Sequence, residues 1–372
     1  MYKLVGSEPV RMVLFQKIFY CFCVFAFILA VLQFVKNVYL KIAISYIFLF
    51  YFTWWDIVGW SNNILSESIS LSYFILWLAI VMAYYRQKST IKLVFLIFIT
   101  ILLSFTRDTW PYLILFFFAM MLCADLILKK GKRLVSIGLV LFSVGLFVFQ
   151  SYTVTVGERS VLPVFNTLAG RIVQNEEHLD WFKKRGMPQA EQLQADFKTI
   201  DVDSYEGKSV MYTRYIDSTY TELFNWVKAN GKSTYQLFLL THFKYFILND
   251  QSLPQLNRIF SYNTYSYYQK PYKFFHNANN VFPIFSVYVS LFLVLICIYL
   301  WRKSKEFHLL FPAIFSLLLF VNVYLSYNAD TMEVERHLYL TTIGIELFSL
   351  LSLAFIGNYA LNTYQTKKKT LQ

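Results

Sequence analysis

Five ionisable side chains lie within ten residues at positions 328–337, between apolar runs at residues 309–327 and 338–356. Each run is long enough to cross a bilayer. Ionisable groups beside hydrocarbon are costly unless they are paired or used in function. A reactive site and a solvated loop with internal salt bridges both explain the group. Its members are Asp330, Glu333, Glu335, Arg336 and His337.

A second polar junction follows the apolar run at residues 38–55 and contains Asp56 and Glu67. Glu67 opens the next apolar helix, where the helix dipole favours a carboxylate. That setting explains Glu67 without any further role, so a structural reading and a catalytic one both stay open.

A third polar junction, formed by Arg107 and Asp108, ends an unusually short apolar run. Only fourteen residues separate Lys92 from Arg107, which is about 21 Å of helix, whereas the hydrocarbon core is about 30 Å thick. Either the membrane thins locally around this helix, or Arg107 and Asp108 lie below the headgroups in a cavity lined by protein. Structurally, Asp108 can also cap the helix that begins near Pro111. We predict that the three junctions form one site.

The composition excludes an ordinary soluble protein. The 372 residues are 57% hydrophobic and only 15% charged, whereas soluble domains are about one-quarter charged. The apolar residues also form blocks of roughly twenty. We therefore expect an all-α, polytopic membrane protein with about nine transmembrane helices. These are predicted at residues 12–35, 38–55, 69–85, 93–105, 111–128, 134–150, 281–301, 309–327 and 338–356.

The distribution of Lys and Arg predicts how the chain is oriented. The formal net charge is +12, and the basic residues cluster at residues 86–92, 129–133, 302–305 and 367–369. By the positive-inside bias these segments are cytoplasmic, with anionic lipid as their partner rather than nucleic acid. We expect a multi-pass protein of the cytoplasmic (inner) membrane with a cytoplasmic carboxyl terminus. All three polar junctions then lie outside.

The predicted spans divide the chain into four parts. Residues 1–150 hold six spans, residues 151–280 form a mainly helical extracytoplasmic insertion, residues 281–360 hold three spans, and residues 361–372 form a basic tail. Within the insertion, a helix stop is predicted at residues 229–231, which read Ala-Asn-Gly. The count also puts the amino terminus outside without a signal peptide. We therefore expect either a missing upstream span and external loop, or a miscounted first span.

Several function classes lack their usual motifs here. The four cysteines all lie in apolar blocks, with neither a disulfide framework nor metal-site spacing. The sequence contains no phosphate-binding loop, no dinucleotide fingerprint and no zinc-protease motif. These observations argue against an ATPase, a Rossmann enzyme and a zinc protease.

Three short stretches together resemble a known family. Ser-Glu-Ser opens a span and is followed by Leu71 and Ser72. Arg-Asp lies at the outer end of a short span, and Glu-x-Glu-Arg-His precedes the last span. This arrangement resembles bacterial polytopic glycosyltransferases of the GT-C type. The resemblance implies sugar transfer from a polyprenyl-phosphate donor on the external face, in assembly of cell-envelope polysaccharide or glycolipid. That superfamily carries a catalytic acid in its first external loop, and this chain has no such loop, so that residue cannot be named.

The candidate side chains suit such a transfer. A carboxylate must accept the proton of the acceptor hydroxyl, and cations must hold the departing phosphate. We assign catalysis to Asp56, Glu67, Asp108, Glu335 and His337, and substrate binding to Arg107, Arg336 and Asp330. Two of the carboxylates can supply oxygen ligands to Mg²⁺ or Mn²⁺, although no spacing demands a metal.

Other functions stay open beside this one. A polysaccharide polymerase or ligase acting on lipid-linked glycans would share the spans, the large external segment and the use of Arg and His. A multi-span transporter or flippase is disfavoured because the ionisable residues gather at span ends rather than near mid-membrane. A membrane scaffold would leave the charged junctions without chemistry.

Overall fold

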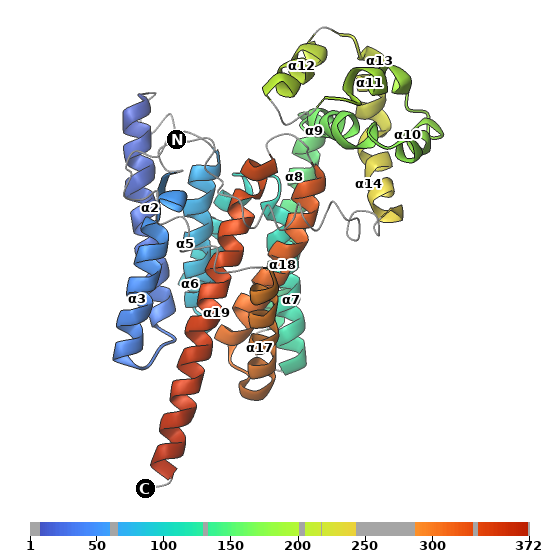
Figure 1. Ribbon diagram of the computed structural model, residues 1–372. Helices are drawn as coiled ribbons and strands as arrows, with labels where there is room; N and C mark the ends of the chain where they lie inside the picture. Colours follow the sequence, from blue (N-terminus) through green and yellow to red (C-terminus); the bar gives the residue numbers. More distant parts are fainter. Residues whose placement is uncertain are drawn as a thin grey trace. The chain divides into compact units, whose positions relative to one another are not determined.

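The computed structural model describes residues 8–59, 66–128, 133–200, 205–216, 218–242, 287–329 and 334–370 (Figure 1). Every regular element within these ranges is a helix, which confirms the predicted all-α class. The chain forms two compact units. The first comprises Met1–Gln150, Asn263–Phe320 and Leu340–Gln372, and the second comprises Ser151–Tyr262 and Val321–Tyr339. Each unit is described by itself.

Within the described residues, six helices are long and apolar enough to cross a membrane. A helix suits hydrocarbon because it satisfies its own backbone hydrogen bonds. By helix length and hydropathy the chain is therefore a multi-pass membrane protein, as predicted. The six helices are α2 (Pro9–Leu32), α5 (Ser66–Arg86), α7 (Trp110–Leu128), α8 (Arg133–Val156), α18 (Phe307–Ala329) and α19 (Val334–Thr370).

The other three predicted spans are also helical. They are α3 (Val38–Thr53), α6 (Thr90–Ser104) and α17 (Val287–Ser304). With 16 and 15 residues, α3 and α6 measure about 24 and 23 Å, less than the roughly 30 Å of the hydrocarbon core. The count of nine transmembrane helices therefore stays a prediction.

A cluster of buried aromatic rings joins four helices of the first unit. Phe117 of α7 stacks on Phe315 of α18 at 4.5 Å between ring centroids, and Phe315 stacks on Phe348 of α19 at 4.8 Å. From α5, Trp77 and Phe74 meet Phe315 edge-on. Helices in lipid associate through close packing rather than exclusion of water. These rings therefore supply the shape that fixes the helix arrangement.

Helices α18 and α19 approach each other closely at Gly344. A Cβ atom added to Gly344 would lie 2.6 Å from Cδ1 of Leu319, which is itself buried. Gly357, thirteen residues along the same helix, has open space where its Cβ would be. The two glycines therefore differ in packing although they share α19.

We expect Gly344→Leu to lower the free energy of unfolding by about 1–3 kcal/mol, because the larger side chain overpacks the contact with Leu319. The matched substitution Gly357→Leu should have little effect. Denaturant unfolding of the full chain in detergent micelles measures both. Equal losses in the two variants would show that the close approach at Gly344 does not matter for stability.

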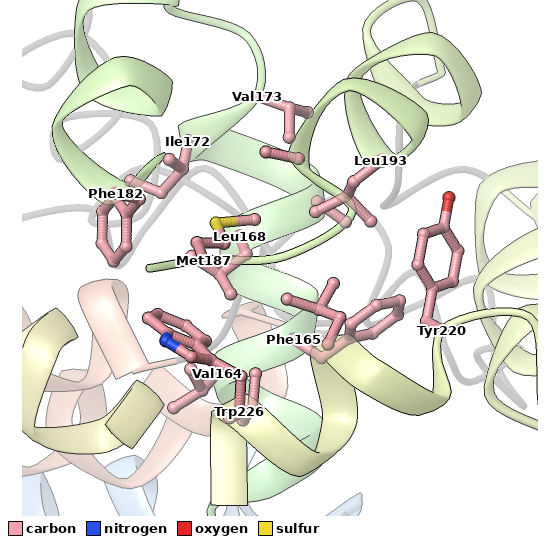
Figure 2. Close-up of a cluster of buried hydrophobic side chains, with 14 of the residues drawn as sticks. Val164, Phe165, Leu168, Ile172, Val173, Phe182, Met187, Leu193, Tyr220 and Trp226 are labelled. Atoms are coloured by element: carbon pink, nitrogen blue, oxygen red, sulfur yellow. The ribbon is translucent and has the colours of Figure 1, made fainter. Parts of the chain in front are cut away.

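The second unit has its own hydrophobic core, part of which Figure 2 shows. Large side chains such as Phe165, Phe182 and Tyr220 are fully buried in it. Several short helices surround this core. They are α9 (Val161–Thr167), η2 (Leu168–Ile172), α10 (Glu176–Lys183), α11 (Ala190–Phe197), α12 (Tyr205–Ile216), α13 (Thr221–Trp226), η3 (Val227–Gly231) and α14 (Lys232–Thr241).

The predicted helix stop at residues 229–231 is wrong. The chain stays helical from α13 through η3, a π-helical turn, into α14. Gly231 has φ −58°, which is ordinary helical backbone. Val227 and Gly231 are both buried, so tertiary packing outweighs the weak helix propensity of Gly and Asn.

His178 of α10 is buried in an aromatic part of the second unit. Its ring lies edge-on to Phe238 at 5.0 Å and to His242 at 5.7 Å between centroids. Burial, and then the neighbouring His242, lower the pKa of His178 from the ordinary value of about 6.5. The folded protein therefore holds this imidazole neutral at pH values where the unfolded chain already binds a proton.

This pKa shift predicts that the second unit loses stability in acid. Unfolding takes up a proton below about pH 6.5, so stability falls as the pH drops from that value through the lower folded-state pKa. The fluorescence midpoint of thermal unfolding of the full chain, measured between pH 7.5 and about pH 5, should fall with pH. His178→Phe, which removes the titrating group, should flatten that dependence. Identical pH profiles for both proteins would contradict the assignment.

Candidate functional site

Glu67 is the most deeply buried of the predicted site residues whose side chains the structure describes. It lies in the first turn of α5 and is 2% exposed. The positive end of the helix dipole stabilises a carboxylate there. A buried charge nevertheless needs an opposite charge nearby, since desolvation is expensive.

Arg107 supplies that opposite charge from the connection between α6 and α7. Its Nη2 atom lies 4.0 Å from Oε1 of Glu67, and the two side chains are only 12% and 3% exposed. This separation is longer than a hydrogen bond, so the two groups form an ion pair at 4.0 Å. The structure thus brings together two of the predicted site residues, one from each of two junctions.

Ser70 helps to fix the position of Arg107 relative to α5. The indole N–H of Trp110 donates to Oγ of Ser70 at 2.6 Å, and Oγ1 of Thr106 lies 2.9 Å from the same oxygen. Trp110 also stacks on Phe74 at 4.8 Å between centroids. Thr106 and Trp110 lie on either side of Arg107 in the chain. Their contacts with Ser70 therefore hold the backbone of Arg107 against the first turns of α5.

Asp108 lies beside this pair in sequence but has a different environment. It is exposed, and the side-chain amide of Gln150 in α8 donates to its Oδ1 atom at 2.5 Å. Gln150 is itself buried. The contact ties the connection between α6 and α7 to the end of α8 and leaves a carboxylate at the surface of the site.

The structure describes no side chain for the other predicted site residues. Asp56 belongs to the short helix α4 (Trp55–Val58), and its side chain lies outside the described part of the structure. The same holds for the side chains at positions 335–337, whose backbone begins α19. Asp330 lies outside the described residues altogether. The contribution of the third junction, with Glu335, Arg336 and His337, therefore stays a prediction.

Among the described residues, no group of three or more His, Cys, Asp or Glu side chains could hold a metal ion. The pair of Glu67 and Arg107 is one acid and one base, so by itself it offers a single carboxylate ligand. The use of Mg²⁺ or Mn²⁺ stays a prediction.

Two carboxylates inside apolar helices were missed by sequence reasoning. Glu346 of α19 lies 3.2 Å from the hydroxyl of Tyr51, which also donates to the carbonyl of Ile343. Asp125 of α7 accepts a hydrogen bond of 2.6 Å from Ser136. The sequence alone could have indicated both residues, because an ionisable residue within a membrane span is by default a candidate for function.

Comparisons with protein-family models, curated proteins and solved structures give no match to this chain. The resemblance to GT-C enzymes therefore rests on the short sequence stretches alone. The described site consists of Glu67, Arg107 and Asp108, with Ser70 and Gln150 as their supports.

A double-mutant cycle tests whether Glu67 and Arg107 are energetically coupled. Glu67→Gln and Arg107→Gln should each reduce the free energy of unfolding, and the double variant should lose less than the sum, by about 0.5–3 kcal/mol. Denaturant unfolding of the full chain in detergent measures all four proteins. As a control, Glu67→Gln combined with the distant Lys303→Gln should be additive. Additivity in the first cycle as well would contradict the coupling.

Proposed function

We propose that this chain is a membrane glycosyltransferase of the GT-C type that transfers a sugar from a polyprenyl-phosphate donor. Its place would be the cytoplasmic membrane, in cell-envelope polysaccharide or glycolipid assembly. The observation that carries the proposal is the buried ion pair of Glu67 and Arg107 with the exposed Asp108 beside it. A guanidinium and an accessible carboxylate are the two groups that transfer from a lipid phosphate requires.

Arg107 is the phosphate-binding group in this proposal. A guanidinium donates two parallel hydrogen bonds to phosphate oxygens, so it recognises phosphate by geometry as well as charge. Glu67 is a positioning residue because its buried carboxylate lies 4.0 Å from Arg107 and holds that side chain at the ends of α5 and α6. At this distance Glu67 attracts Arg107 less strongly than a direct hydrogen bond would. The phosphate of the lipid-linked sugar can therefore compete with Glu67 for Arg107.

Asp108 is the proposed proton acceptor. It is exposed, whereas Glu67 is almost fully buried, so an acceptor molecule reaches Asp108 more readily. The acceptor hydroxyl oxygen attacks the anomeric carbon of the sugar, and its proton passes to the Asp108 carboxylate. The bond between that carbon and the phosphate oxygen breaks, and its electron pair leaves with the lipid phosphate, whose charge Arg107 stabilises.

The membrane arrangement belongs to the same proposal. All nine apolar helices would span the bilayer, with the basic helix ends in the cytoplasm and the site outside, as the charge bias predicts. The short helices α3 and α6 would require a thinner bilayer or shielding by neighbouring helices. Residues 151–280 would be extracytoplasmic by the same bias.

Transfer assays with the full chain in proteoliposomes test the proposal. The probe is radiolabelled polyprenyl-phosphate glucose, with an envelope lipid and glycan extract as acceptor. Arg107→Gln and Asp108→Asn should each slow transfer about a hundredfold or more. Glu67→Gln should mainly raise KM for the donor, and Glu67→Asp should restore part of the loss. Lys303→Gln, an exposed cation outside the site, should transfer like the wild type.

Unchanged transfer in both Arg107→Gln and Asp108→Asn would overturn the assignment of the site. Movement of the labelled lipid across the bilayer without cleavage of its sugar would identify a flippase instead. Extension of a pyrophosphate-linked glycan without use of the monosaccharide donor would identify a polymerase or ligase.

A further inference from the structure

A cavity of about 390 Å³ opens in the first unit at the end opposite the paired Glu67. It is lined by Leu29, Leu32 and Gln33 from the end of α2, by Lys41 from the first turns of α3, and by Arg86, the last residue of α5. The cavity is shallow and open on its outer side, so a ligand bound in it also contacts its surroundings. None of the functions considered so far uses this cavity.

The wall of the cavity carries two positive charges and no acidic residue. Within the described part of the chain, neither Lys41 nor Arg86 forms an ion pair. The nearby Lys88, in contrast, lies 3.8 Å from Oδ2 of Asp125. The guanidinium of Arg86 lies over the ring of Phe34 at 5.8 Å, a contact that orients it without neutralising it. The cavity therefore carries positive charge with no acidic residue in its lining, and it favours an anion.

The floor of the cavity continues into an apolar surface. Phe22, Phe25 and Leu29 are 58%, 62% and 46% exposed. Their spacing of three and four residues places them on one face of α2. Because Leu29 also lines the cavity, the apolar face leads directly to the two cations. A ligand that fits both parts has a negatively charged group joined to a hydrocarbon chain.

The turn between α2 and α3 is held in place from outside the cavity. Asn358 of α19 donates to the carbonyl of Phe34 at 3.1 Å and accepts from the backbone N–H of Lys36 at 3.4 Å. The side chain of Asn37 caps the start of α3 by accepting from the N–H of Leu40. The backbone that carries Gln33 and Lys41 is thus ordered before any ligand binds, which lowers the entropic cost of binding.

We propose that this cavity binds the phosphate group of an anionic membrane lipid. Lys41 and Arg86 contact the phosphate oxygens, Gln33 offers its side-chain amide, and one acyl chain follows Phe22, Phe25 and Leu29. Free phosphate would meet the same cations but gain nothing from the apolar face. The inference is independent of the proposed sugar transfer, since it concerns the opposite end of the first unit.

Native mass spectrometry of the full chain tests this site. The protein is released from mixed micelles that contain equal amounts of phosphatidylglycerol and phosphatidylcholine, and the retained lipids are counted. The wild type should retain phosphatidylglycerol preferentially. Lys41→Gln and Arg86→Gln should each reduce that retention about fivefold, the effect of about 1 kcal/mol per cation near an anionic lipid. Lys303→Gln is the matched control, an exposed cation outside the cavity, and should retain the lipid fully.

Two further measurements separate the lipid from its alternatives. Leu29→Trp, which fills the apolar wall and keeps both charges, should also reduce retention of phosphatidylglycerol. Inorganic phosphate in large excess should displace it only weakly, and complete displacement would show that the site takes free phosphate instead. Equal retention of the two lipids by the wild type overturns the proposal without requiring any variant to fold. Full retention by the double variant Lys41→Gln/Arg86→Gln overturns it equally.

Discussion

Stacked rings in the first unit determine how four of its helices pack. In hydrocarbon, an apolar side chain gains no free energy by leaving its surroundings, so helices recognise one another by fit. Phe117, Phe315 and Phe348 form a continuous stack from α7 through α18 to α19. Phe74 of α5 contacts that stack and also Trp110. The packing that holds the bundle together therefore also fixes the start of α7 against α5.

This arrangement explains how a charged pair is tolerated at the end of the bundle. Burying Glu67 and Arg107 costs desolvation energy that their attraction only partly returns. Well-packed apolar residues at the same positions would make the folded protein at least as stable. The hydrogen bond from Trp110 to Ser70 and the contact of Gln150 with Asp108 nevertheless hold the charged segment in one place. A bundle that keeps such a pair has a polar feature that its stability does not require, which is the physical basis for treating it as a site.

The helices themselves could be predicted from sequence because long apolar runs leave the backbone no other way to satisfy its hydrogen bonds in lipid. The proximity of Glu67 and Arg107 could be predicted in part, because a chain that crosses a membrane repeatedly brings every second connection to the same side. The bond between Trp110 and Ser70 could not be predicted, because it depends on the rotation of two helices about their axes. The continuous helix through Gly231 was missed for a similar reason. Local propensity favours a stop there, and only the buried surroundings of Val227 and Gly231 decide otherwise.

Helix α19, drawn in red in Figure 1, has 37 residues and measures about 55 Å. The bundle holds this helix at more than one point: Gly344 is in tight contact with α18, and Asn358 bonds to the turn between α2 and α3. The helix continues for about 18 Å from Asn358 to Thr370. One continuous helix therefore links the contact with α18 to the turn between α2 and α3, two points about 21 Å apart along its axis.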